Sequence, residues 1–443
     1  MPGSLVRGDA SGSEGHGKVL ALSGLFGQGL RSFDSNRGMA LAGGLFNAGS
    51  AMLFWVVIAR RMPVSIVGVA STIAAACATI NLLTAFGVEN GVAAYARRTP
   101  KPGALLNVGI GASAGASTIG AVIFAVGYGS HQKDLRMYLV GVGLLLFVVW
   151  NIAAAASPVM DIFTIVRGYG NLTFIRSVFI GISKVCLAIL VPPKVPYIVA
   201  ACFLPVLCSL LLGWALLRWK DPGFRSFGIR GAGARSAGRF AFRTTWSSLL
   251  FNLPTLLMPV IVLSLLGPVR AGWFYPAWSI VLVAALPGSM LSQIALSEVS
   301  DRADVQHAWS AEIGAMAISC VIAVGLFVFA PILLLFFGKT YAIASTGQVR
   351  ILAVGLVPWT ACAVKSATLR AQHRHVLVDV ASVVYAVAAV GGAAMLAHRF
   401  GGEGVACAWI GAVALGAALV HAGSIILPIR RLRKTRYLHV RRY

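Results

Sequence analysis

The ionisable residue that stands out most in this sequence is Lys184, which lies inside a long apolar stretch. Its neighbours Ile180–Ser183 and Val185–Leu187 are apolar or small. A helix expected over residues 174–191 places Lys184 about ten residues (~15 Å) from one helix end. In a bilayer, an ammonium group at that depth is costly unless it faces a cavity or a partner. Lys184 is therefore a candidate cation for an anionic ligand group, and an internal pair with a carboxylate or a displaced helix end is the alternative.

Two further charged residues of opposite sign precede basic turns in the sequence. Lys365 stands shortly before Arg370, and Asp161 stands shortly before Arg167. If the chain is duplicated, the two residues occupy related depths, so we hypothesise that they pair in one conformational state and separate in another. Asp161 would then act in gating, and Lys365 is also a candidate substrate-binding cation. The alternative is that both charges lie in water at the membrane rim.

Four other positions carry polar or helix-bending groups within apolar segments. Glu89 is a candidate for gating or ion coupling, and an ordinary interfacial helix end explains it equally well. Pro254 removes a backbone hydrogen bond and can kink its helix, which suits a hinge. Asn47 and Asn252 are candidate substrate-binding amides, with interhelical packing as the alternative.

The sequence contains no recognisable catalytic or cofactor-binding constellation. It has no Gly-x-Ser-x-Gly nucleophile elbow and no Gly-x-x-x-x-Gly-Lys-Ser phosphate loop. The 7 cysteines lie inside apolar blocks without a Cys-x-x-Cys pair, so neither a disulfide framework nor a metal site is indicated. We expect no cofactor, no metal and no enzymatic activity.

The composition is that of a membrane protein. Hydrophobic residues make up 58% of the chain and charged residues only 11%, whereas soluble proteins are about 25% charged. The apolar blocks are about 20 residues long, the length at which a helix crosses the hydrocarbon core. The formal net charge of +24 reflects basic residues beside these blocks, which indicates attraction to anionic lipid rather than to nucleic acid.

The sequence therefore predicts an all-α polytopic membrane protein of about 12 transmembrane helices. The expected helices are 38–59, 64–87, 104–128, 137–160, 174–191, 197–217, 246–266, 271–296, 311–337, 349–369, 376–397 and 404–427. Most of the 37 Lys and Arg residues fall in the tails and in alternate connections. By the positive-inside rule, both termini lie in the cytoplasm.

The chain divides into two similar sets of helices. A six-helix half over 38–217 and another over 244–427 are joined by a basic cytoplasmic linker, 218–243. A flexible tail, 1–37, precedes them and a basic tail, 428–443, follows. Pro63–Gly68 before the second helix resembles Pro268–Gly272 before the eighth. Both halves share one orientation, so a pseudo-twofold axis along the membrane normal and a central cavity are expected.

Three segments resemble a known family. Leu265–Phe274, Leu335–Tyr341 and Leu369–Arg374 resemble, in this order, connections in O-antigen-type polysaccharide flippases of the multidrug/oligosaccharidyl-lipid/polysaccharide (MOP) exporter superfamily. Arg167–Asn171 is the counterpart of the third segment in the first half. The resemblance implies a flippase for an undecaprenyl-diphosphate-linked oligosaccharide in the bacterial inner membrane. It also implies that the first, second, seventh and eighth helices line the cavity, which favours Asn47 and Asn252.

Other function classes remain open from the sequence. A multidrug or cation exporter of the same superfamily would favour acidic cavity residues, whereas the clearest deep charge here is Lys184. A membrane polymerase or ligase generally needs a large external loop, and the expected external loops are short. An assembly scaffold is a further alternative, and polysaccharide polymerase machinery is a candidate partner. The paired halves make a monomer the default.

Overall fold

The computed structural model describes residues 35–85, 87–96, 102–220, 234–288, 305–372 and 374–426. All the regular secondary structure in these ranges is helical. The first half consists of α2 (Ser35–Arg61), α3 (Val64–Ala85), α4 (Val88–Tyr95), α5 (Pro102–Phe124), η1 (Ala125–Gly129), α6 (Lys133–Arg136), α7 (Val142–Val166), α8 (Gly170–Leu190) and α9 (Val195–Lys220). The second half consists of α10 (Ala234–Leu266), α11 (Pro268–Ala284), α13 (Val305–Leu335), α14 (Lys339–Ala371) and α15 (His375–Ile426).

The described helices confirm the predicted all-α polytopic fold. Within these ranges, 11 helices are long and apolar enough to cross a membrane. The last of them, α15, contains Gly401 at φ 60°, where two helices meet at a kink. Counted as two, it brings the number of crossings to the expected twelve. Large apolar side chains such as Val321, Val387 and Met395 are exposed, as expected for helix faces that contact lipid.

The predicted domain boundaries fall close to helix ends. Helix α2 starts at Ser35 rather than at 38, and α9 extends to Lys220. Helix α10 starts at Ala234, so its first residues lie within the expected linker. The rest of the predicted linker, the tail 1–34 and the tail from 427 lie outside the described residues.

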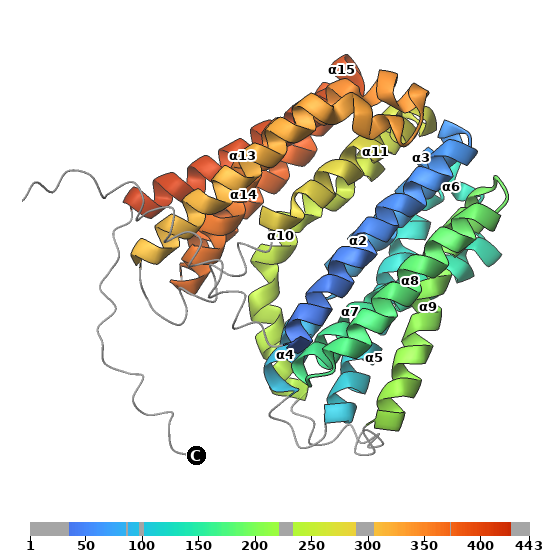
Figure 1. The fold of residues 1–443 in the computed structure, drawn as a ribbon, viewed down its shortest axis with the longest axis vertical. Coiled ribbons are helices and arrows are strands. Elements are labelled where there is room, and N and C mark those ends of the chain that lie inside the picture. Colours follow the sequence, from blue (N-terminus) through green and yellow to red (C-terminus); the bar gives the residue numbers. More distant parts are fainter. Residues whose placement is uncertain are drawn as a thin grey trace, which may run out of the picture.

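The two halves meet mainly through α3 of the first half, which lies against α10 and α11 of the second. Figure 1 shows the two sets of helices close together at the top of the view, where α3 and α11 meet, and diverging below, where α10 reaches α4. We call the side with the connections at 62–63, 191–194, Gly267 and Gly338 the far side, and the opposite side the linker side.

Two glycines allow α3 and α11 to touch through their backbones on the far side. A Cβ atom added to Gly68 would lie 2.7 Å from the Gly272 nitrogen and would also collide with the Pro268 carbonyl. One added to Gly272 would collide with the Val64 carbonyl. Because even a methyl group would force these helices apart, glycine is required at both positions. These are the segments whose sequences resemble each other in the two halves.

Prolines shape α10, the first helix of the second half. Pro254 and Pro259 both lie inside it, and Pro254 is buried. Pro259 has no N–H to offer to the Thr255 carbonyl, and the indole Nε1 of Trp278 donates to that carbonyl instead at 3.1 Å. A side chain of α11 thus replaces a missing bond in α10, which fixes the two helices to each other at the bend.

Candidate functional site

Lys184 stands in the far-side part of α8. The helix starts at Gly170, four residues earlier than expected. Lys184 is therefore ~21 Å from the start of α8 and ~9 Å from its end at Leu190. Lys184 therefore lies farther from the start of its helix than the ~15 Å expected from the sequence. The side chain is half-buried.

No carboxylate neutralises Lys184 in the part of the chain that the structure describes. Its ammonium group interacts electrostatically with the Cys202 thiol of α9, but no salt bridge of Lys184 occurs among the described residues. The alternative of an internal ion pair therefore receives no support. The other alternative was a displaced helix end. Helix α8 does begin four residues earlier than expected, but Lys184 still lies inside the apolar span Gly170–Leu190.

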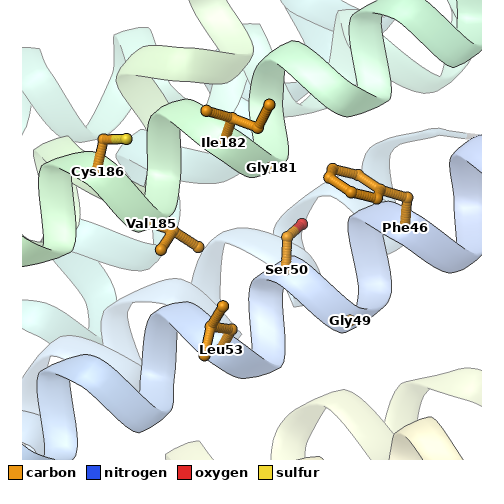
Figure 2. Close-up of a pocket in the computed structure, with 8 residues that line it drawn as sticks. All are labelled: Phe46, Gly49, Ser50, Leu53, Gly181, Ile182, Val185 and Cys186. Carbon is orange, nitrogen blue, oxygen red and sulfur yellow. The ribbon is translucent and has the colours of Figure 1, made fainter.

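An apolar groove runs between α2 and α8 beside Lys184. Its volume is about 420 Å³, and Figure 2 shows side chains of both helices around it. It is lined by Phe46, Gly49, Ser50, Leu53, Gly181, Ile182, Val185 and Cys186. The Ser50 hydroxyl donates to the Asn47 carbonyl at 3.0 Å, so its one hydrogen-bond donor is already used within α2. The groove is therefore suited to hydrocarbon rather than to polar groups.

The two candidate asparagines differ in their environments. Asn47 on α2 is half-buried, and its Oδ1 atom is buried without a hydrogen-bond partner in the described residues. Such an orphaned acceptor is costly unless a ligand or water satisfies it, so Asn47 remains a candidate for binding. Asn252 on α10 is exposed, close to the buried hinge candidate Pro254.

Asp161 belongs to a buried ion-pair cluster within the first half. Arg176 of α8 is fully buried and donates from one terminal nitrogen to Asp161 Oδ1 of α7 at 2.5 Å. It also donates to the Ser157 hydroxyl at 3.0 Å and to the Ser209 carbonyl of α9 at 3.2 Å. Gly213 of α9 leaves the room that this guanidinium needs, since a Cβ there would lie 2.7 Å from Arg176 Cδ. We call these residues the Arg176 cluster; it ties α7, α8 and α9 together.

Glu89 lies close to the Arg176 cluster. It is half-buried in the short helix α4, which is not one of the candidate membrane spans. Burial raises the pKa of the Glu89 carboxyl above its ordinary value of 4.5, and the nearby Asp161 charge raises it further. Glu89 and Asp161, both predicted as gating or coupling residues, are thus neighbours.

Lys365 belongs to a second cluster, within the other half. Its ammonium lies 3.4 Å from Glu312 Oε2, and the other carboxylate oxygen lies 2.6 Å from His421 Nε2. Glu312 is 6% exposed and Lys365 is 8% exposed. This Glu312 cluster joins α13, α14 and α15. In this conformation Asp161 contacts Arg176 and Lys365 contacts Glu312, so a direct Asp161–Lys365 pair stays a prediction for another state.

The far side is closed by contacts between the halves. Arg60 of α2 donates from Nε to the Phe336 carbonyl at 2.6 Å and from a terminal nitrogen to the Leu335 carbonyl at 3.3 Å. These carbonyls end α13, where the helix dipole favours a cation. The Tyr128 hydroxyl also contacts the Ser264 hydroxyl of α10. With Gly68 and Gly272, these groups join the two halves on the side of the short connections.

Comparison with known proteins gives a match in structure but not in sequence. No protein-family model and no curated protein sequence matches the chain. A structure of the lipid II flippase MurJ in an inward closed conformation matches with a TM-score of 0.65 and 12% identity, over 87% of each chain. An inward-facing multidrug resistance MATE transporter of the MOP superfamily matches with a TM-score of 0.64 and 16% identity, over 87% of this chain and 94% of that one.

The fold of this chain is similar to the fold of these transporter structures. An outward-facing structure of a MATE transporter of this superfamily matches with a TM-score of 0.57 and 15% identity, covering 88% of this chain and 93% of that one. This similarity in fold agrees with the resemblance seen in the three sequence segments. At these identities the likeness concerns the fold alone, and the roles of individual residues rest on the geometry of this chain.

Sequence reasoning missed three residues of the two charged clusters. Arg176 was expected at the start of its helix, whereas α8 begins six residues before it. Glu312 was expected at the start of a helix, whereas α13 begins at Val305. His421 lies inside the apolar segment expected over 404–427. Its position inside an apolar segment, four residues after Ala417, is the signal that was available.

Proposed function

We propose that this chain flips an undecaprenyl-diphosphate-linked oligosaccharide from the cytoplasmic to the periplasmic leaflet of the bacterial inner membrane, with both termini in the cytoplasm. The observation that carries this proposal is Lys184, a half-buried cation in an apolar helix without a carboxylate partner in the described residues. An unneutralised cation in this environment favours an anionic ligand, because the ligand's charge offsets its desolvation.

The fold supports a transport cycle in which the two halves move against each other. The far side is joined by Arg60, Gly68 and Gly272. On the linker side, α13, α14 and α15 lie away from the first half, while α10 stays in contact with α4 (Figure 1). A head group entering from the linker side reaches Lys184 only after passing most of the length of α8. Its prenyl tail remains in the surrounding hydrocarbon. Binding drives the cycle only insofar as the two states differ in affinity for the ligand.

The second candidate function is export of cationic drugs, which the structural likeness to MATE transporters supports equally. The charge distribution favours the flippase. The Asp161 carboxylate is already paired with Arg176. The Glu312 carboxylate is already paired with Lys365 and His421. An organic cation would have to displace these partners, whereas no carboxylate among the described residues competes with an anion for Lys184.

We also propose that the chain acts as a monomer, beside polysaccharide polymerase machinery and anionic lipid. Each half already ties its own helices together through a buried charge cluster. The activity of a scaffold or of a membrane polymerase would not depend on Lys184. Substitution of Lys184, described next, therefore distinguishes these two alternative functions from transport.

The experiment is the accumulation of the lipid-linked intermediate in the polysaccharide-producing native host, after deletion of the chromosomal copy. The wild type, Lys184→Ala and Lys184→Arg are restored at matched membrane levels, and the intermediate on the cytoplasmic leaflet is quantified. We expect the wild type to clear it, Lys184→Ala to strand at least ~10-fold more, equivalent to a loss of ~1.4 kcal/mol, and Lys184→Arg to retain most activity. Clearance by all three would refute the role of Lys184, and no accumulation in the deletion strain would refute the flippase.

A further inference from the structure

The Glu312 cluster contains an arrangement of hydrogen-bond acceptors that requires an additional proton. The two ring nitrogens of His421 each face an oxygen acceptor. Nδ1 lies 2.8 Å from the Ala417 carbonyl, and Nε2 lies 2.6 Å from the Glu312 carboxylate. A neutral imidazole carries one N–H and can donate to only one of them.

Both short contacts are hydrogen bonds only if the pair holds one more proton. Either His421 is an imidazolium that donates to both oxygens, or Glu312 is a carboxylic acid that donates to a neutral His421. In both cases a single proton sits between the two side chains. We propose that Glu312 and His421 form a proton-binding site that controls the contact between the linker-side parts of α13 and α15.

Lys365 sets the charge balance of this proton site. Its ammonium, 3.4 Å from the second Glu312 oxygen, neutralises the carboxylate when His421 is neutral. Binding of the proton then gives the cluster one net positive charge, and its release restores neutrality. The cluster therefore has a neutral state and a cationic state, which differ in their cost inside a membrane protein.

Other charged groups lie on helices of the same half. Arg370 of α14 interacts electrostatically with Asp379 of α15, and an Arg374 terminal nitrogen donates to the Ser424 carbonyl of α15 at 3.5 Å. Helix α10 also lies against α15. Its residues 249–266 include no ionisable side chain, and its first residues, 234–248, contribute Arg235, Arg239 and Arg243.

Release of the proton leaves His421 with one N–H for its two acceptors. Donation from Nε2 keeps the bond to Glu312 and turns the Nδ1 lone pair toward the Ala417 carbonyl, whereas donation from Nδ1 leaves two acceptors facing each other between α13 and α15. In both tautomers the ionic attraction between the two side chains is lost, so the link between α15 and α13 weakens, while Lys365 keeps Glu312 attached to α14. The His421 side chain is 34% exposed, and it lies close to the linker-side end of α15 at Ile426.

The test measures the α13–α15 separation as a function of pH in lipid nanodiscs, without any substrate. Spin labels are placed on Cys320 of α13, which is exposed, and on Ile425→Cys of α15, where Ile425 is 79% exposed. The other native cysteines are replaced by alanine. We expect the distance distribution to shift to longer values as pH rises, with a dependence on one proton.

Glu312→Gln and His421→Asn should each abolish this shift, because neither variant can hold the shared proton. Asp161→Asn, in the corresponding cluster of the first half, is the matched control and should retain it. A wild-type distribution that does not change with pH, or a shift that persists in both variants, would overturn the proposal. Variants that fail to enter nanodiscs are replaced by Glu312→Asp, which should shift the midpoint without abolishing the transition.

The use of this proton in transport rests on the proposed function and has its own readout. Imposing a pH gradient on vesicles should change the rate of flipping by the wild type and not by Glu312→Gln. A pH-dependent distance with no effect of the gradient would leave the proton site in place and reject coupling. Absence of all flipping would instead reject the proposed function, because the distance measurement needs no substrate.

Discussion

Each half contains a buried charge cluster that joins three of its helices, but the two clusters contain different ionisable side chains. In the first half, Arg176 donates to three acceptors from α7 and α9. A guanidinium keeps its charge at every accessible pH, so this cluster is a permanent tie. In the second half, Glu312 is held by Lys365 and by His421. Histidine changes its charge near neutral pH, so this cluster can respond to conditions.

The difference teaches how one fold can combine rigidity with response. Both clusters bind helices of the same half, and neither bridges the halves. The first should hold α7, α8 and α9 as one body throughout a transport cycle. The second should allow α15 to detach from α13 when a proton leaves.

The largest expected effect is on stability, from Arg176→Met. The substitution leaves Asp161 without its cation and the Ser209 carbonyl without its donor, and removal of one partner of a buried pair costs about 3–5 kcal/mol. Because Asp161 is 33% exposed, we expect the lower end of this range. The measurement is the unfolding midpoint in detergent. Lys365→Met is the matched variant, and it should cost less because His421 still binds Glu312; equal losses would contradict the comparison.

The next effect concerns the contacts between the halves, which must break if each half moves as a unit. Gly68→Leu should prevent α3 and α11 from touching and should increase the far-side separation by several ångströms. Distances between labels on the far-side ends of α2 and α13 measure this change. Gly115→Leu is the control, since a Cβ there meets nothing within 4 Å. An unchanged separation in Gly68→Leu would show that the far-side seal lies elsewhere.

A charge exchange tests whether Asp161 and Lys365 meet in another state. Asp161→Lys together with Lys365→Asp should restore transport lost by each single change if they pair during the cycle. Because both residues have partners within their own halves here, we expect the double variant to recover at most about 1 kcal/mol of coupling. Transport rates of the four proteins form a double-mutant cycle. If the double variant transports no faster than either single variant, Asp161 and Lys365 do not pair with each other during the cycle.

The smallest effect is expected from Glu89, beside the Arg176 cluster. Its carboxyl has a raised pKa because of burial and the nearby Asp161. The folded state therefore binds this proton more tightly than the unfolded state, so stability falls as pH rises from the ordinary carboxyl value toward the raised pKa. Glu89→Gln should remove this part of the pH dependence, as measured by unfolding midpoints over pH 4–8. A parallel dependence in both proteins would indicate that Glu89 is solvated.

Much of the fold could be predicted from the sequence, because each apolar block is long enough to span a bilayer. The placement of the charges was less accessible. A shift of four residues at the start of α8 moved Lys184 toward the far side and brought Arg176 inside the helix. Glu312 and His421 are separated by 109 positions, and only the packing of both α13 and α15 against α14 brings them together. Sequence periodicity does not contain that information.

The central claim is that Lys184 binds the anionic head group of a lipid-linked saccharide, and flipping by the purified protein tests it most directly. The chain is reconstituted in vesicles with a fluorescent prenyl-diphosphate sugar, and its transfer between leaflets is followed by quenching from outside. We predict protein-dependent transfer that falls at least ~10-fold in Lys184→Ala and is retained in Lys184→Arg. Transfer at the wild-type rate in Lys184→Ala would contradict this account.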